Sequence, residues 1–173
     1  RTLCESFGPA RVLVADDTDV ADLSTVLFPS PSYLLDPVPG AGPLVALAGA
    51  LETIGEPLVF LLAADMPGVT PEYLRALDRV QRGPGRNADV LVPVSGGVPQ
   101  VTCAFYRHSL VEKMRESVRA GARSLSAWIR RPDIAVRFVG EDETWPHGHA
   151  GASDNQNTPL DYMHYLRRPV HGR

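Results

Sequence analysis

The 173-residue sequence lacks several features that mark particular classes of protein. It has two cysteines, Cys4 and Cys103, and neither belongs to a C-x-x-C or Cys/His pattern of a zinc site. We therefore expect both thiols to be reduced and structural. No apolar run approaches the roughly 20 residues that cross a bilayer, since the run LVFLLAA at 58–64 ends at Asp65. The sequence predicts no membrane anchor.

A large excess of charge of one sign and several catalytic motifs are also missing. The formal net charge is -3 and the basic residues are scattered, which argues against duplex nucleic acid or an anionic membrane as partner and leaves room for a small anionic ligand. There is no G-x-S-x-G elbow, Walker lysine or H-E-x-x-H motif, so acyl-transfer and protease chemistry lose support. His147 and His149, in the polar segment PHGH, are expected to be solvated rather than metal ligands.

What is present is the pattern of one globular α/β domain. Hydrophobic residues make up 44% of the chain and charged residues 21%, and 173 residues can bury a core without crosslinks. Short apolar runs at 10–16 and 58–64 read as buried parallel strands, the second in the middle of the sheet. Helices are predicted from Pro43 to Gly55 and, capped by Thr70, from Pro71 to about Gln81.

The second half predicts an antiparallel pair followed by more helices. Strands at 89–94 and 100–106 flank a glycine-containing turn. A capping box at Ser109 and Glu112 predicts a helix to about Ala120, and a short helix starts near Ser124. A strand at 134–140, a long loop and a helix opening at 158–159 complete the chain. These elements predict a three-layer α/β/α domain with a mostly parallel sheet and an antiparallel hairpin.

The strongest chemical candidate is Asp65, at the carboxyl end of the predicted central strand. Open α/β sheets bind ligands beyond that end, and a carboxylate there can hold a magnesium ion that substrate phosphates also ligate. By spacing alone, Asp65 could equally cap the following turn. Asp36 precedes a loop with Gly40 and Gly42, whose backbone could let a flat or charged ligand approach amide groups near a helix start, or could be only a tight turn.

For other polar residues the sequence allows two interpretations, contact with a ligand or a local structural role. Asp16 could face a ligand after the first strand, whereas Asp17 and Asp19 are better explained as a solvated loop. Asn155 and Asn157, in DNQNTP, could bond either a ligand or the backbone ahead of a helix cap.

Five motifs in one order resemble the molybdenum cofactor guanylyltransferases. They are D-x5-GPL from Asp36, LLAADMP, GVPQVTCAFY, AGARSL and NQNTP. The resemblance covers nearly the whole chain. It implies a cytoplasmic, Rossmann-like nucleotidyltransferase that joins GTP to molybdopterin with Mg²⁺ and releases pyrophosphate. Proteins that supply or accept the molybdenum cofactor would be transient partners.

The resemblance also assigns roles to individual residues. Asp65 matches the catalytic, magnesium-holding aspartate. Asp36 and Gly42 fall on the nucleotide side, and Asp16 stands where the family often has an asparagine that contacts the nucleotide. The residues expected on the molybdopterin side are Gln100, Arg123, Ser124, Asn155 and Asn157.

One departure from the family affects the domain as a whole. The family's opening strand and its glycine-rich, triphosphate-cradling loop are absent, and Arg1 to Gly8 reads as the end of a helix already under way. We therefore expect a single domain over 1–173 that lacks this segment and is catalytically incompetent without it.

Three alternatives stay open. A molybdenum cofactor cytidylyltransferase is disfavoured by GPL, Met66 and Asn157. A sugar-phosphate nucleotidyltransferase shares the expected fold. A non-catalytic module would be a relative that has truly lost the phosphate loop.

Overall fold

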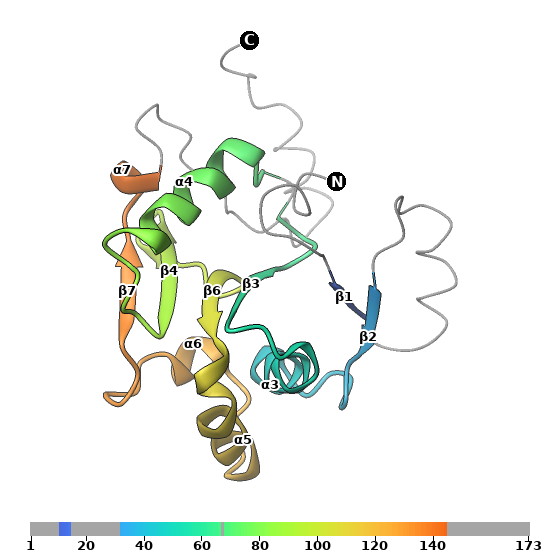
Figure 1. Cartoon of the computed structure of the whole chain (residues 1–173). Helices are drawn as coiled ribbons and strands as arrows, with labels where there is room; N and C mark the ends of the chain where they lie inside the picture. Colours follow the sequence, from blue (N-terminus) through green and yellow to red (C-terminus); the bar gives the residue numbers. More distant parts are fainter. Residues whose placement is uncertain (1–10, 15–31, 67, 145–173) are drawn as a thin grey trace.

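The structure is a computed structural model that describes residues 11–14, 32–66 and 68–144 (Figure 1). The strands are β1 (Arg11–Val14), β2 (Ser32–Leu35), β3 (Leu58–Leu62), β4 (Val90–Ser95), β5 (Val98–Pro99), β6 (Cys103–Arg107) and β7 (Val136–Val139). The helices are α3 (Pro43–Ile54), α4 (Pro71–Arg82), the 3₁₀ turn η1 (His108–Leu110), α5 (Val111–Arg119), α6 (Leu125–Trp128) and α7 (Glu141–Thr144).

The described strands form two hydrogen-bonded groups. β1 and β2 are a parallel pair, and the larger sheet has the order β3-β6-β4-β5, with β7 also paired to β4. Because β6 is antiparallel to both β3 and β4, and β7 is parallel to β4, the strands β3, β4 and β7 point the same way. The sheet is therefore mixed, with antiparallel strands inserted among parallel ones, as expected for this α/β class.

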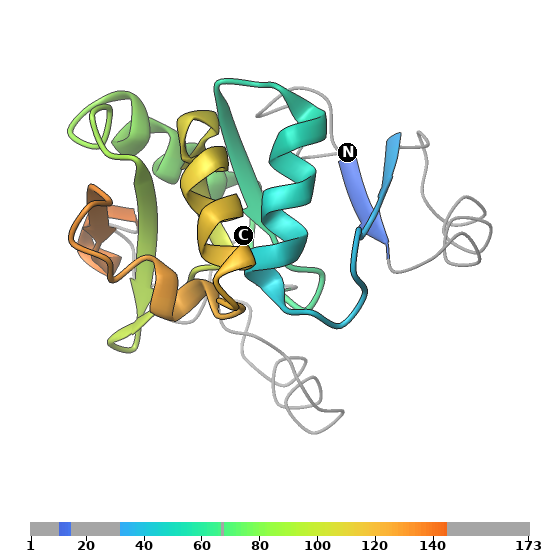
Figure 2. The ribbon, with the colours of Figure 1, turned by 90° about the horizontal axis from the view of Figure 1, so that it is seen from below.

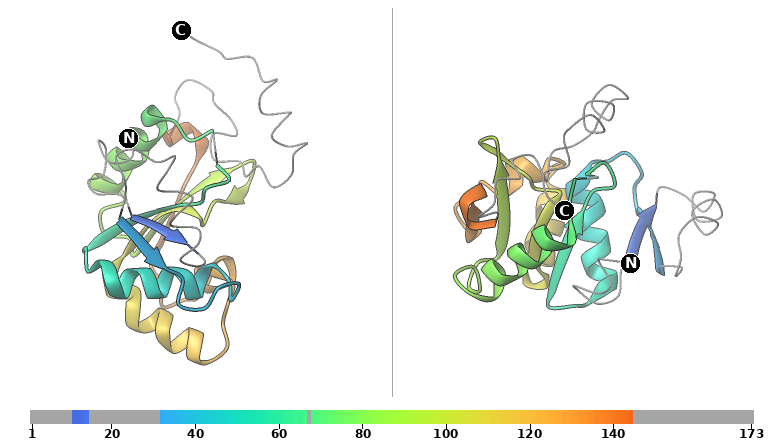
Figure 3. Two further views of the ribbon diagram at one scale, coloured as in Figure 1. Left: turned by 90° about the vertical axis from the view of Figure 1, so that its right-hand side faces the viewer. Right: turned by 90° about the horizontal axis from the view of Figure 1, so that it is seen from above.

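Helices cover both faces of the larger sheet, which confirms the three-layer arrangement. Figure 3 shows α3 and α5 on one side and α4 and α7 on the other. Side chains alternate along the strands: Ala104 and Tyr106 join the core under α3, α5 and α6, whereas Cys103 and Phe105 join the core under α4. This period of two is the pleat of a β-strand between two apolar layers.

The ends of α3 and α4 follow from their sequences as predicted. Pro43 opens α3, and Gly55 ends it in the left-handed conformation, with φ of 68°. Thr70 caps α4 by accepting a hydrogen bond from the Tyr73 N–H (3.3 Å), and Pro71 is the first helical residue. Both helices therefore begin at fixed points just after the carboxyl ends of β2 and β3.

Among the described strands, β3 pairs with β6 alone, so these strands do not place it in the middle of the sheet as predicted. All five of its residues are half-buried. An apolar run is typical of a strand covered on both faces, but composition does not reveal which strand lies beside it.

Three local predictions also need correction. The antiparallel pair exists, but Gly96 and Gly97 form its turn, with φ of 54° and 79°, so Gln100 lies in a second turn before β6. The Ser109 capping box is absent, because η1 leads directly into α5 and the Val111 N–H already bonds the His108 carbonyl.

The third correction concerns the segment after β7, which was expected to be loop. It begins with α7, whose first turn carries three acidic residues, a favourable placement at the positive end of a helix. The terminal helix predicted from residue 158, and the helix end read in residues 1–8, lie outside the described residues.

Candidate active site

The site is built at the carboxyl ends of β2 and β3. In Figure 2, β1, β2 and β3 run down the picture, and the start of α3 and the loop between α5 and α6 lie at the same lower edge. Sequence spacing predicted ligand binding at this edge, where carboxyl ends of parallel strands meet helix starts.

Asp36 directly follows β2 and is held by its own turn. Its N–H donates to the Val14 carbonyl at 2.8 Å, which extends the β1–β2 ladder by one bond. Its Oδ1 accepts from the Val38 N–H at 3.0 Å, so the carboxylate closes a turn two residues ahead. The side chain is half-buried, and one carboxylate oxygen is occupied by the turn.

Asp65 lies in the turn after β3. That turn is anchored on one side by the Ala63 N–H, which donates to the Thr102 carbonyl at 2.8 Å, and on the other by Met66, which is buried at 4% exposure. The Oδ1 atom of Asp65 is buried and has no hydrogen-bond partner within the described part of the chain. Leaving such an oxygen unsatisfied costs about 1–3 kcal/mol, more if it is charged, so the geometry favours a ligand or cation at this atom.

Gly42 starts α3 and touches a segment far away in sequence. Its φ of 101° is left-handed, and a Cβ built on it would lie 3.0 Å from the Arg123 carbonyl oxygen. The same carbonyl accepts a hydrogen bond from the Leu44 N–H at 3.3 Å. The nucleotide-side residue Gly42 and the molybdopterin-side residue Arg123, predicted separately, are therefore in contact.

This contact corrects one expectation about the glycine loop. The sequence suggested that a ligand could reach amide groups at the start of α3, but the Leu44 N–H is taken by Arg123, and the Val45 and Ala46 N–H groups both donate to the Gly42 carbonyl. Proline at the preceding position has no N–H. The first turn of α3 is thus closed by protein atoms.

The side chains predicted for the molybdopterin side make local bonds. The Arg123 guanidinium donates to the Val118 and Ala122 carbonyls (3.0 and 2.9 Å) at the end of α5. The Ser124 hydroxyl accepts from the Ala127 N–H at 3.2 Å and caps α6. Gln100 Nε2 donates to the Val98 carbonyl at 3.2 Å. Each side chain stabilises its own turn in this structure.

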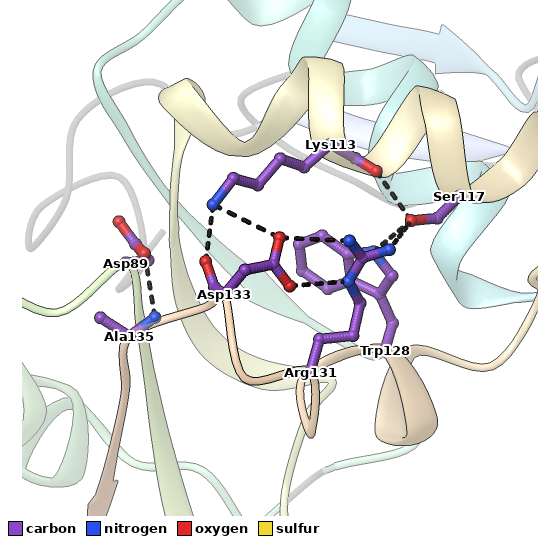
Figure 4. Close-up of polar contacts among 7 residues, drawn as sticks. All are labelled: Asp89, Lys113, Ser117, Trp128, Arg131, Asp133 and Ala135. Carbon is purple, nitrogen blue, oxygen red and sulfur yellow. Dashed lines mark hydrogen bonds and ion pairs between the residues drawn. The ribbon is translucent and has the colours of Figure 1, made fainter.

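A polar cluster next to the 121–124 loop, which connects α5 to α6, joins these two helices to the segment before β7 (Figure 4). The Ser117 hydroxyl donates to the Lys113 carbonyl and accepts from Trp128 Nε1 at 2.9 Å and from the Arg131 guanidinium at 2.8 Å. Arg131 in turn makes a two-pronged ion pair with Asp133. All of these groups have partners, so the cluster fixes the 121–124 loop rather than forming a second site.

The remaining predicted residues stand as follows. Asp16, Asn155 and Asn157 lie outside the described residues, as do Cys4, His147 and His149. Cys103 is a free, buried thiol, as predicted; burial raises its pKa to about 12. Sequence reasoning missed Tyr33, whose buried hydroxyl has no hydrogen-bond partner among the described residues. No local pattern in a four-residue strand could have identified it.

No cluster of three or more His, Cys, Asp or Glu side chains suited to a metal ion occurs in the part of the chain that the structure describes. No helix in the described ranges is long and apolar enough to cross a membrane.

Two curated proteins are similar in sequence to part of this chain. A protein of Mycobacterium tuberculosis H37Rv named probable molybdenum cofactor guanylyltransferase is 36% identical over 112 residues, which are 63% of this chain and 54% of the relative. One of the same name from Chloroflexus aggregans is 34% identical over 132 residues, 73% of this chain and 60% of the relative. The chain thus spans little more than half the length of these relatives.

Solved structures agree on the fold. Molybdopterin-guanine dinucleotide biosynthesis protein A of Archaeoglobus fulgidus superposes with a TM-score of 0.72 at 22% identity, covering 94% of this chain and 80% of that one. Rv0371C of Mycobacterium tuberculosis, solved in complex with manganese, gives 0.64 at 16% identity, covering 97% and 83%. The family model described as the MobA-like NTP transferase domain matches residues 2–136. The chain therefore belongs to the MobA-like NTP transferase family.

Proposed function

We propose that this protein transfers GMP from GTP to the terminal phosphate of molybdopterin and releases pyrophosphate. The single observation that carries the proposal is Asp65: a carboxylate oxygen buried without a hydrogen-bond partner among the described residues, at the carboxyl end of β3. Family membership and the names of the relatives support this choice among nucleotidyl transfers.

The residues present fit a divalent cation, for which we propose Mg²⁺. A hard cation takes oxygen ligands, and one carboxylate suffices when substrate phosphates and water complete its shell. Asp65 supplies such an oxygen at the carboxyl end of β3, where substrate phosphates could complete the shell. When bound, the cation supplies neutralisation of charge on the phosphates.

The reaction itself is a displacement at phosphorus. An oxygen of the molybdopterin phosphate forms a bond to the α-phosphorus of GTP, and the bond from that phosphorus to the bridging oxygen of the β-phosphate breaks. Pyrophosphate leaves with the electron pair. The protein acts by positioning two mutually repelling anions, so no covalent enzyme intermediate is needed.

We assign the two sides of the site from their segments. Asp36 and Gly42, with Asp16, belong to the nucleotide side, and the half-buried Asp36 carboxylate is available to donors of the nucleotide beside its own turn. Gln100, Arg123, Ser124, Asn155 and Asn157 belong to the molybdopterin side. For Arg123 this requires the guanidinium to exchange the Val118 and Ala122 carbonyls for a phosphate, a charge-assisted and stronger partner.

We further propose that one more strand completes the sheet between β1 and β3. Figure 1 shows β1 and β2 beyond the β3 end of the larger sheet, and neither β1 nor β3 has a second strand partner among the described residues. The β3 sequence LVFLL carries no lysine, proline or other device of a natural sheet edge. The family's opening strand and phosphate loop would occupy this position, and GTP, a cytoplasmic metabolite, would be bound there.

The proposal is tested in the full-length protein by pyrophosphate release from GTP in the presence of molybdopterin and Mg²⁺. Asp65→Asn should lower the rate by about 100-fold or more, because it removes the charged oxygen that would hold the cation against the reacting phosphates. The matched control is Asp78→Asn, which removes a carboxylate that pairs with Arg82 on the surface of α4. Unchanged turnover in Asp65→Asn would refute the assignment.

The same assay, run with GTP or with CTP, measures which nucleotide the protein uses. GTP should support turnover and CTP should not. Preference for CTP would make the protein a cytidylyltransferase, and binding of either nucleotide without turnover would make it a binding module.

A further inference from the structure

The starting observation is that two loops assigned to opposite sides of the site share one contact. The loop from Asp36 to Gly42 follows β2, and the loop from Gly121 to Ser124 joins α5 to α6. They meet where the Arg123 carbonyl oxygen accepts the Leu44 N–H and faces Gly42. About 80 residues separate the two loops in the sequence, so the contact belongs to the tertiary structure.

The 36–42 loop is fixed along its length. Asp36 bonds Val14 at one end, and the Ala41 N–H donates to the Val38 carbonyl at 3.0 Å. The Pro37 ring packs against α3 so closely that a Cβ on Gly49 would lie 2.7 Å from it. We therefore expect a shift imposed at Gly42 to be passed along the loop to the turn that holds Asp36.

The 121–124 loop is fixed by the Arg123 side chain. Its guanidinium bonds two carbonyls at the end of α5, and Gly121, with φ of 93°, lets the chain reverse there. A guanidinium drawn to an anionic ligand would give up these two bonds, and the main chain that carries the Arg123 oxygen would lose part of its support.

We infer that Arg123 is a positioning residue for the 36–42 loop, acting through its main-chain carbonyl, and that this contact couples occupancy of the 121–124 side to affinity for nucleotide on the Asp36 side. The inference rests on the proposed function in placing the nucleotide beside Asp36 and an anionic ligand at the 121–124 side. Coupling between two sites is reciprocal, and about 5-fold is at the low end of measured cases.

The test compares alanine substitutions at two glycines of the 36–42 loop, of which only Gly42 lies at the contact. Gly42→Ala adds a methyl group against the Arg123 carbonyl, whereas Gly40→Ala meets nothing within 4 Å, and both residues have left-handed φ, 101° and 78°. In the full-length protein, Gly42→Ala should weaken binding of Mg²⁺-GTP by about 5-fold or more, while Gly40→Ala should change it by less than half as much. Melting temperatures show whether both variants carry a similar backbone strain.

Amide hydrogen exchange over residues 36–41 is the readout that does not depend on function. Gly42→Ala and Arg123→Ala should each speed exchange there, and the double variant should do little more than either alone, since both act on one contact. Unchanged exchange in Gly42→Ala, or equal effects of Gly40→Ala and Gly42→Ala, would overturn the inference. If the wild-type protein binds no nucleotide, the proposed function fails, while the exchange experiment still decides whether the contact positions the 36–42 loop.

Discussion

At the scale of single residues, most polar side chains near the site are already engaged, and Asp65 Oδ1 and the Tyr33 hydroxyl are the buried exceptions among the described residues. Arg123, Ser124 and Gln100 bond nearby main-chain groups, so each has a structural role beside its assigned one. The Asp65 oxygen has no partner of this local kind in the described part of the chain. Its position could be predicted because a buried strand that ends in an acidic residue is a local pattern. The Gly42–Arg123 contact could not, since it joins residues about 80 positions apart.

Asp133 provides a pH test of the cluster that supports the 121–124 loop. Hydrogen bonding from the Arg131 guanidinium, aided by the charges of Arg131 and Lys113, holds the pKa of the Asp133 carboxyl below its usual value. A carboxyl whose pKa is lower in the folded than in the unfolded protein stabilises the fold above the unfolded pKa, about 3.9, and loses this effect as pH falls through the folded pKa.

Asp133→Asn should therefore lower the free energy of unfolding at pH 7, and its deficit relative to wild type should shrink as pH falls below about 4. Denaturant unfolding from pH 7 to about 3 measures this. Arg131→Gln should remove the same pH-dependent part because Arg131 is the main cause of the shift. A deficit that stays constant over the whole range would contradict the assignment.

At the scale of elements, the ends of α3 and α4 were predictable and the neighbours of β3 were not. Thr70, Pro71 and Gly55 act through bonds and dihedral angles within a few residues, and α3 and α4 begin and end there. Which strand lies next to β3 depends on residues of β6 more than 40 positions later, and its apolar sequence is compatible with several neighbours. The predicted capping box at Ser109 does not form, because in η1 the His108 carbonyl already accepts the Val111 N–H.

The cap of α4 should contribute measurably to stability. Thr70→Ala removes the hydroxyl that accepts the Tyr73 N–H, which should cost about 1 kcal/mol of unfolding free energy and lower the melting temperature by about 2–4 °C. Thr53→Ala is the matched control, since its exposed hydroxyl only bonds the Gly49 carbonyl within α3 and alanine is the better helix former. Equal losses in the two variants would show that the Thr70 hydroxyl is not the cause.

At the scale of the whole molecule, the described strands stop short of one continuous sheet. The α/β class and its three layers could be predicted from the alternation of strands and helices, because each layer needs an apolar face to cover. The order of strands could not, and the separation of the β1–β2 pair from β3 appears only in the structure.

Amide exchange in the full-length protein tests whether another strand closes this gap. If it does, every amide of β1 and β3 should exchange as slowly as those of β4, which is paired with both β6 and β7. If β3 is a true edge, alternate amides, those pointing away from β6, should exchange fast while the others stay protected. The second pattern would rule out the added strand.

The late arrival of β6 also affects how the protein is made. β3 bonds a partner that the ribosome adds about 40 to 50 residues later. At about 5–20 residues per second, the LVFLL segment waits on the order of 2–10 s before that partner emerges. During this interval α3, already complete, is available as temporary cover for one side of the nascent strand, and chaperones are natural competitors for the other.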